Sequence, residues 1–97
     1  MFLGAFIDNE MVGFIMGSYD SRKGWLNRLA VLPEHRRKGI GHALVEEMEK
    51  RLKAMGIRII ATLIEDGHEH SMTLFKNAGY MVHRDITYLT KREDGDV

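Results

Sequence analysis

The sequence predicts an α/β (α+β) domain: a mixed antiparallel and parallel sheet, a helix that starts at a glycine turn, and a second short helix. Three observations lead to this prediction. Apolar runs separated by polar turns occupy the N-terminal part of the chain, as in antiparallel strands. A glycine-rich turn then joins a strand to an amphipathic helix. A run of β-branched residues follows, and this strand–helix–strand order favours a parallel pair with a right-handed crossover.

Three antiparallel strands are expected first. Phe2–Ile7 and residues 12–19 are apolar runs separated by a polar break, so they form a predicted β-hairpin. A second polar turn at 20–24 leads into a third strand at 25–32. This strand ends at Pro33, because proline has no backbone N–H to donate to a sheet. Phe2–Ile7 is then the edge of the sheet.

Helical periodicity begins after the glycine turn. A helix at about 41–55 is predicted from apolar residues that recur at spacings of three and four, namely Ile40, Ala43, Leu44, Met48, Leu52 and Met55. Gly56 stands where a left-handed residue ends a helix. Residues 58–64 are rich in β-branched side chains and short enough for a buried strand parallel to 25–32.

The C-terminal part contains a second short helix, expected at about 71–78 and closed by Gly79. Residues 80–90 are expected to supply one or two final strands. We take residues 1–91 as a single domain and residues 92–97 as an acidic, disordered tail.

The composition excludes several classes of protein. Fourteen basic and fourteen acidic residues cancel, so the whole chain is no polyanion binder and we expect no nucleic-acid partner. The absence of cysteine excludes disulfides and thiol chemistry. No apolar run reaches the ~20 residues of a membrane span, and the N-terminus lacks the basic region of a signal peptide. We expect a cytoplasmic protein without a membrane partner.

The most informative motif is the basic turn before the first helix. Arg36, Arg37 and Lys38 carry positive charge, and Gly39 and Gly41 let an anion approach the backbone without meeting a Cβ atom. The first N–H groups of a helix lack internal partners and carry partial positive charge. The turn therefore predicts a phosphate site. It lacks the Lys-Ser/Thr of a P-loop and the third glycine of a dinucleotide fingerprint.

Arg36, Gly39 and Gly41 form an Arg-x-x-Gly-x-Gly pattern directly after a predicted strand. This pattern resembles the pyrophosphate-binding signature of the GNAT acetyltransferase superfamily. Residues 71–80, Ser-Met-Thr-Leu-Phe-Lys-Asn-Ala-Gly-Tyr, resemble the family's Ala-x-x-Leu-Tyr-x-x-x-Gly-Phe. The likeness covers nearly the whole chain.

The resemblance implies an N-acetyltransferase that moves an acetyl group from acetyl-coenzyme A, as co-substrate, to a primary amine, without a metal. In the family, pantetheine lies where two parallel strands splay apart and bonds the exposed backbone of one of them. By resemblance these contacts fall on Leu29, Ala30 and Val31. The pyrophosphate contacts carry over to the glycine turn, that is to Arg36, Arg37, Lys38, Gly39, Ile40, Gly41 and His42.

The catalytic half of the family pattern is altered. Phe75 stands where the family often has a tyrosine that protonates the leaving thiolate, and phenylalanine has no proton to give. His68 stands at a frequent asparagine position, so we expect it to contact coenzyme A. His68 and Glu65 are the candidate catalytic residues. Tyr80 replaces a phenylalanine that is normally packed. The alternative function is a non-catalytic module or partner subunit that binds coenzyme A or an acyl-coenzyme A.

Two side-chain patterns have simpler interpretations. His68 and His70 form a His-x-His pair, but no third ligand follows at a usual spacing, so a solvated loop is favoured over a metal site. Asn27 lies in the middle of a predicted strand and could face the cleft, although such a residue more often faces solvent or bonds a neighbour.

The start of the chain also differs from the family. The family's fold normally opens with a strand and one or two helices before the hairpin, whereas this chain starts at the hairpin. The resemblance thus implies a shortened variant, a fragment, or a sheet completed by a partner chain. Because an uncovered edge strand at Phe2–Ile7 invites pairing with another chain, we expect a homodimer.

Overall fold

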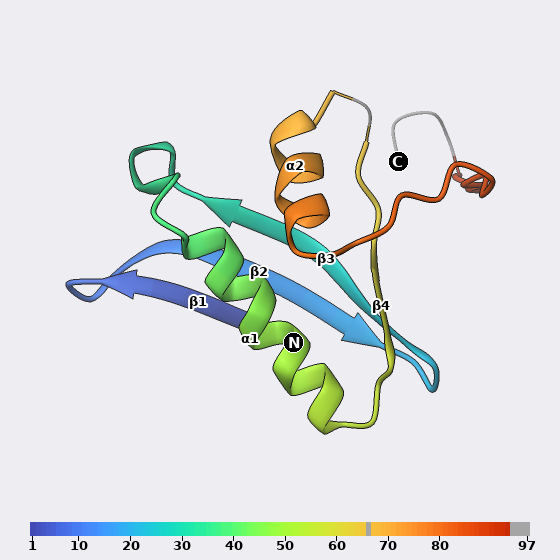
Figure 1. Ribbon diagram of the computed structural model, residues 1–97, viewed down its shortest axis with the longest axis horizontal. Coiled ribbons are helices and arrows are strands. Elements are labelled where there is room, and N and C mark those ends of the chain that lie inside the picture. Colours follow the sequence, from blue (N-terminus) through green and yellow to red (C-terminus); the bar gives the residue numbers. More distant parts are fainter. Residues whose placement is uncertain (66, 94–97) are drawn as a thin grey trace.

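A four-stranded sheet in the order β1-β2-β3-β4 carries both helices on one face (Figure 1). The computed structural model describes residues 1–65 and 67–93. The strands are β1 (Phe2–Ile7), β2 (Glu10–Tyr19), β3 (Lys23–Val31) and β4 (Ile59–Thr62). The first three are antiparallel neighbours, and β4 is parallel to β3. These pairings confirm the predicted mixed sheet and place β1 at its edge.

Both predicted helices are present. α1 (Ile40–Ala54) follows the glycine turn, and Gly56 ends it with a left-handed φ of +89°. α2 (Glu69–Asn77) ends in the same way at Gly79, whose φ is +95°. A 3₁₀ turn, η1 (Pro33–His35), connects β3 to the glycine turn. Within the described residues, neither helix has the length and apolar character needed to cross a bilayer.

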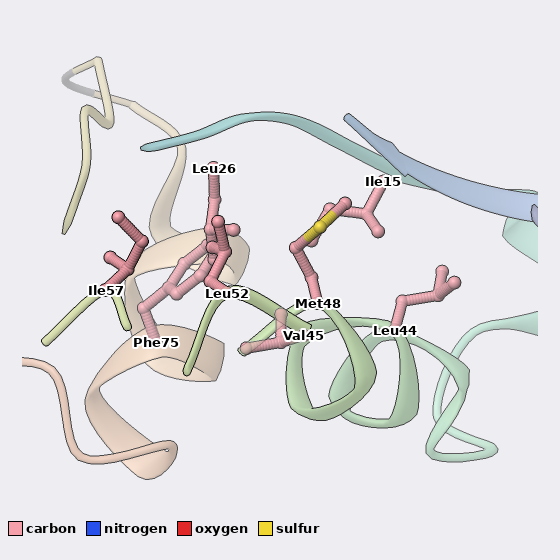
Figure 2. Packing of buried hydrophobic residues seen from close by; sticks show 8 residues of the cluster. All are labelled: Ile15, Leu26, Leu44, Val45, Met48, Leu52, Ile57 and Phe75. Carbon is pink, nitrogen blue, oxygen red and sulfur yellow. The ribbon is translucent and has the colours of Figure 1, made fainter. Parts of the chain in front are cut away.

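The hydrophobic core lies between the sheet and the two helices (Figure 2). Its buried members are Ile15, Leu26, Leu44, Val45, Met48, Leu52, Ile57 and Phe75. Each side chain of this kind stabilises the fold by roughly 1.5–3 kcal/mol when fully buried. α1 approaches the sheet closely, because a Cβ atom on Gly24 would lie only 2.7 Å from Cδ1 of Leu52. The core therefore fixes α1 on the sheet and attaches α2 to it through Phe75.

The prediction of final strands at 80–90 is wrong for this structure. Described residues 80–93 form no strand, and β4 is the last strand of the sheet. Met81, Ile86, Tyr88 and Leu89 are each exposed by 70% or more. A β-prone sequence forms a strand only where a neighbouring backbone and a packed face receive it, and this segment has neither. Of the predicted acidic tail, residues 94–97 lie outside the described part of the chain.

Candidate functional site

β3 and β4 separate part of the way along the sheet. Their pairing runs from Lys23 and Ile59 to Leu26 and Thr62, where the Thr62 hydroxyl donates a hydrogen bond to the Leu26 carbonyl at 2.8 Å. Beyond this point β3 continues to its end while β4 stops. Figure 1 shows β3 and the chain after β4 diverging, with α2 beside the opening. The structure therefore has the expected splay between two parallel strands.

A β-bulge lies at the point where the strands separate. Met16 pairs with Arg28 and Gly17 pairs with Leu26, so Asn27 is an extra residue in β3 without a partner in β2. A bulge bends its strand and increases the local twist, which turns β3 away from β4. Asn27 uses its side-chain amide to donate a hydrogen bond to Ser18 Oγ at 2.9 Å. Sequence reasoning did not identify this bulge.

At the end of β3, some backbone groups face the opening instead of β2. The Leu32 N–H donates to the Val12 carbonyl at 2.9 Å, so the backbone groups of Leu32 are directed to β2. Hydrogen-bonded and non-hydrogen-bonded pairs alternate along antiparallel strands. Leu29 and Val31 therefore direct their N–H and C=O groups away from β2, whereas those of Ala30 point toward it. Of the three residues predicted to bond pantetheine, two have the required backbone orientation.

A cavity of about 310 Å³ occupies the opening. Its lining comes from β3, from β4 and the residues after it, and from α2: Leu26, Asn27, Arg28, Leu29, Thr62, Leu63, Ile64, Glu65, His68, Ser71 and Phe75. The structure thus brings together the predicted residues Leu29, Glu65, His68 and Phe75. Ser71 was missed by sequence reasoning, although its spacing of four residues from Phe75 places both on one helix face.

The glycine turn has the geometry of an anion site. Gly39 caps α1 with φ of +81°, and no side chain caps the helix N-terminus. The first turn of α1 contains no acidic residue, so its N–H groups and partial positive charge are not compensated there. Arg37 also has a left-handed φ, of +66°, and the exposed Arg36, Arg37 and Lys38 side chains add positive charge. A Cβ atom added at Gly39 would have no atom within 4 Å.

Two residues of this turn have structural contacts that the sequence did not reveal. A Cβ atom on Gly41 would lie 2.8 Å from Cδ1 of Leu74, so this glycine lets α2 pack against the start of α1. The expectation that Gly41 leaves space for an anion therefore needs correction, because the space beside it is filled by α2. Arg36 Nε donates a hydrogen bond to the Val31 carbonyl at 3.1 Å and so ties the turn to the end of β3.

Tyr80 anchors the end of α2, in agreement with its expected packed role. Its hydroxyl donates a hydrogen bond to Glu49 Oε2 on α1 at 2.7 Å. Its ring contacts Phe75 edge-on, with ring centroids 5.1 Å apart. Burial raises the pKa of the Tyr80 hydroxyl above its usual range, and the hydrogen bond and charge of Glu49 raise it further. Tyr80 is therefore a structural residue that positions α2.

Other predicted residues lie at the margins of the site. Ile40 and His42 are partly buried in the first turn of α1. His70 is exposed in the first turn of α2 and does not line the cavity. In the described part of the chain, no three side chains of the kinds that bind metals gather at one place.

The sequence and the fold of this chain are similar to those of known acetyltransferases. The chain matches the acetyltransferase (GNAT) family over residues 1–80. The PaiA N-acetyltransferase of Thermoplasma acidophilum, solved in complex with coenzyme A, is 32% identical, with a TM-score of 0.83. The match covers 86% of this chain and 52% of that enzyme, so this chain spans about half of its length.

Two more distant structures share the fold. The aminoglycoside N-acetyltransferase AAC(6')-Iy, solved in complex with coenzyme A, is 20% identical, with a TM-score of 0.84, and the match covers 94% of this chain and 75% of that one. A ribosomal-protein-alanine N-acetyltransferase from Brucella melitensis is 22% identical, with a TM-score of 0.76, over 94% of this chain and 69% of that one. The splayed strands, the uncapped glycine turn and the family match over residues 1–80 agree: this chain belongs to the acetyltransferase (GNAT) family.

Proposed function

We propose that this chain is an N-acetyltransferase that transfers the acetyl group of acetyl-coenzyme A to a primary amine. The observation that supports this most directly is the continuity of the site. β3 leads from the cavity at Leu29, past the outward-facing backbone of Val31, to the uncapped N-terminus of α1. Membership of the family and the coenzyme A complex of the 32% identical PaiA enzyme also support it.

In this proposal each part of the site has one role. The N–H groups at the start of α1 and the basic side chains of the turn bind the pyrophosphate. The outward N–H and C=O groups of Leu29 and the outward N–H of Val31 hydrogen-bond the pantetheine arm as a further strand would, whereas the Val31 C=O accepts from Arg36. The thioester then lies toward the closed end of the cavity at Leu26 and Thr62. Water is partly excluded there, so hydrogen bonds to the developing charge are strengthened.

The acceptor amine enters from the open side of the cavity, where Glu65 and His68 are exposed. A free lysine-type amine has a pKa of about 10.4, so it must lose a proton before it attacks. His68 and Glu65 are the groups placed to accept this proton, directly or through water. Holding the amine beside the thioester supplies much of the rate in such a reaction.

Binding is tested by a matched pair of glycine variants. Gly39 and Gly56 both have positive φ, and at both an added Cβ atom would have no neighbour within 4 Å. Alanine at either position should therefore cost a similar roughly 1–2 kcal/mol of stability. Only Gly39→Ala should weaken coenzyme A binding, by at least about tenfold in calorimetry, because only Gly39 adjoins the proposed phosphate site. Equal affinities in the two folded variants would refute the site.

The second candidate function is a binding module without catalysis. Phe75 favours it, because this buried side chain offers no proton to a leaving thiolate. Release of free thiol from acetyl-coenzyme A in the presence of a panel of amines separates the two candidates. Tight binding without amine-dependent release would leave only the module.

The proposal extends to the assembly and location of the chain. A homodimer is supported by the position of β1 at the sheet edge and by its exposed Phe2 and Phe6 side chains. A cytoplasmic location is supported by the absence of cysteine, which suits a reducing compartment.

A further inference from the structure

Cleavage of a thioester places negative charge on the leaving sulfur, so a hydrogen-bond donor near the sulfur lowers the barrier. Few cavity side chains can supply this donor. The Thr62 hydroxyl donates to the Leu26 carbonyl. The Asn27 amide has two N–H donors, and one of them is engaged by Ser18 Oγ. Phe75 is buried and apolar. Among the described residues of the lining, the remaining side-chain donors are the second N–H of Asn27, Arg28, His68 and Ser71.

Ser71 differs from the other three in its surroundings. Asn27, Arg28 and His68 are exposed. Ser71 is half-buried in the first turn of α2. Ser71 and Phe75 are four residues apart and therefore share the helix face that lines the cavity. A donor shielded from water interacts more strongly with a developing charge than an exposed one does. Both its position and its environment suit a contact with the leaving group.

We propose that the Ser71 hydroxyl donates a hydrogen bond to the sulfur of coenzyme A as the acetyl group leaves. This inference rests on the proposed acetyl transfer. In that reaction the nitrogen–carbon bond forms and the carbon–sulfur bond breaks, and the electron pair of the broken bond goes to sulfur. The proton that the attacking nitrogen loses ends on the sulfur, which leaves as a thiol. Ser71 is unchanged at the end of the cycle.

The inference can be tested without turnover. A hydrogen bond to the thiolate stabilises it, so it lowers the pKa of the bound coenzyme A thiol. This pKa is measured by the ultraviolet absorbance of the thiolate as the complex with coenzyme A is titrated. The thiol should titrate about one pH unit higher in Ser71→Ala than in the wild type. In Ser71→Thr, which keeps the hydroxyl, it should titrate close to the wild-type value.

Thr73→Ala is the matched control, because Thr73 is an exposed hydroxyl residue of the same helix that does not line the cavity. It should leave the thiol titration unchanged. In steady-state assays Ser71→Ala should lower kcat about tenfold and change the dissociation constant of coenzyme A less than twofold.

The outcomes separate this inference from the proposed function. An unchanged thiol titration in Ser71→Ala would overturn the role of Ser71, whatever the activity. A larger dissociation constant for coenzyme A in Ser71→Ala, with an unchanged thiol titration, would also overturn it. Ser71 would then contact another part of coenzyme A. Failure of the wild-type chain to bind coenzyme A would overturn the proposed function itself.

Discussion

At the scale of single residues, Tyr80 shows how one hydroxyl connects two helices. Its hydroxyl reaches Glu49 on α1, and its ring packs on Phe75 of α2. The neutral hydroxyl is the form that suits this half-buried position, because ionisation would place a second negative charge beside Glu49. The contact therefore makes the stability of the fold depend on pH.

The raised pKa of Tyr80 predicts a loss of stability in base. In the unfolded chain this hydroxyl ionises near pH 10, whereas in the folded chain it still holds its proton. The stabilisation is thus complete below about pH 10 and is lost as the pH rises further toward the folded pKa. Urea unfolding from pH 8 to 11.5 should show a steeper loss of unfolding free energy in the wild type than in Tyr80→Phe. Tyr88→Phe, at an exposed tyrosine, should behave like the wild type. Parallel curves for the wild type and Tyr80→Phe would contradict the assignment.

At the scale of elements, the position of α2 depends on its contact with the start of α1. Gly41 has no positive φ, so an alanine there suits the helix and should gain about 1 kcal/mol in helix propensity. In the wild type this gain is offset, because the new Cβ atom would lie 2.8 Å from Cδ1 of Leu74 and the leucine must move.

A double-mutant cycle tests this packing. Gly41→Ala should stabilise the chain by about 1 kcal/mol in a Leu74→Ala background and by clearly less in the wild type. Urea unfolding of the four proteins measures the difference. An equal gain in both backgrounds would mean that Gly41 and Leu74 do not interact.

Some of these elements could be predicted from the sequence, whereas the contacts between them could not. β1 to β3 and α1 follow from local periodicity, and the glycine turn follows from a short motif, so all of them could be located in advance. The Asn27 bulge, the contact between Gly41 and Leu74, and the hydrogen bond between Tyr80 and Glu49 depend on residues far apart in the chain. Such contacts leave no local pattern. The prediction of strands at 80–90 was wrong for a related reason. β-propensity describes how well a segment fits against neighbouring strands, and the segment alone does not determine it.

At the scale of the whole molecule, the described helices cover one face of the sheet and leave the other uncovered. Leu3 and Ala5 pack on the core beneath the helices. Because side chains alternate along a strand, Phe2 points to the opposite face, where it stacks on Phe14 at a centroid distance of 5.5 Å and pairs with Met16. Apolar side chains therefore gather on the uncovered face beside the unpaired edge of β1. A second copy of the chain that paired with this edge would satisfy its free backbone groups and add cross-strand contacts to the apolar side chains of β1.

The proposed homodimer predicts how the chain sediments. At micromolar concentrations it should sediment with twice the mass of the monomer. Phe6→Lys replaces a side chain that is 59% exposed on the edge strand with a charge, which opposes strand pairing, so this variant should be monomeric over the same range. Leu89→Lys removes an even more exposed apolar side chain from the segment after α2, so it controls for the general effect of added charge and should remain dimeric. A wild-type chain that stays monomeric throughout would exclude the homodimer. Dissociation by both lysine variants alike would show that association does not depend on the β1 edge.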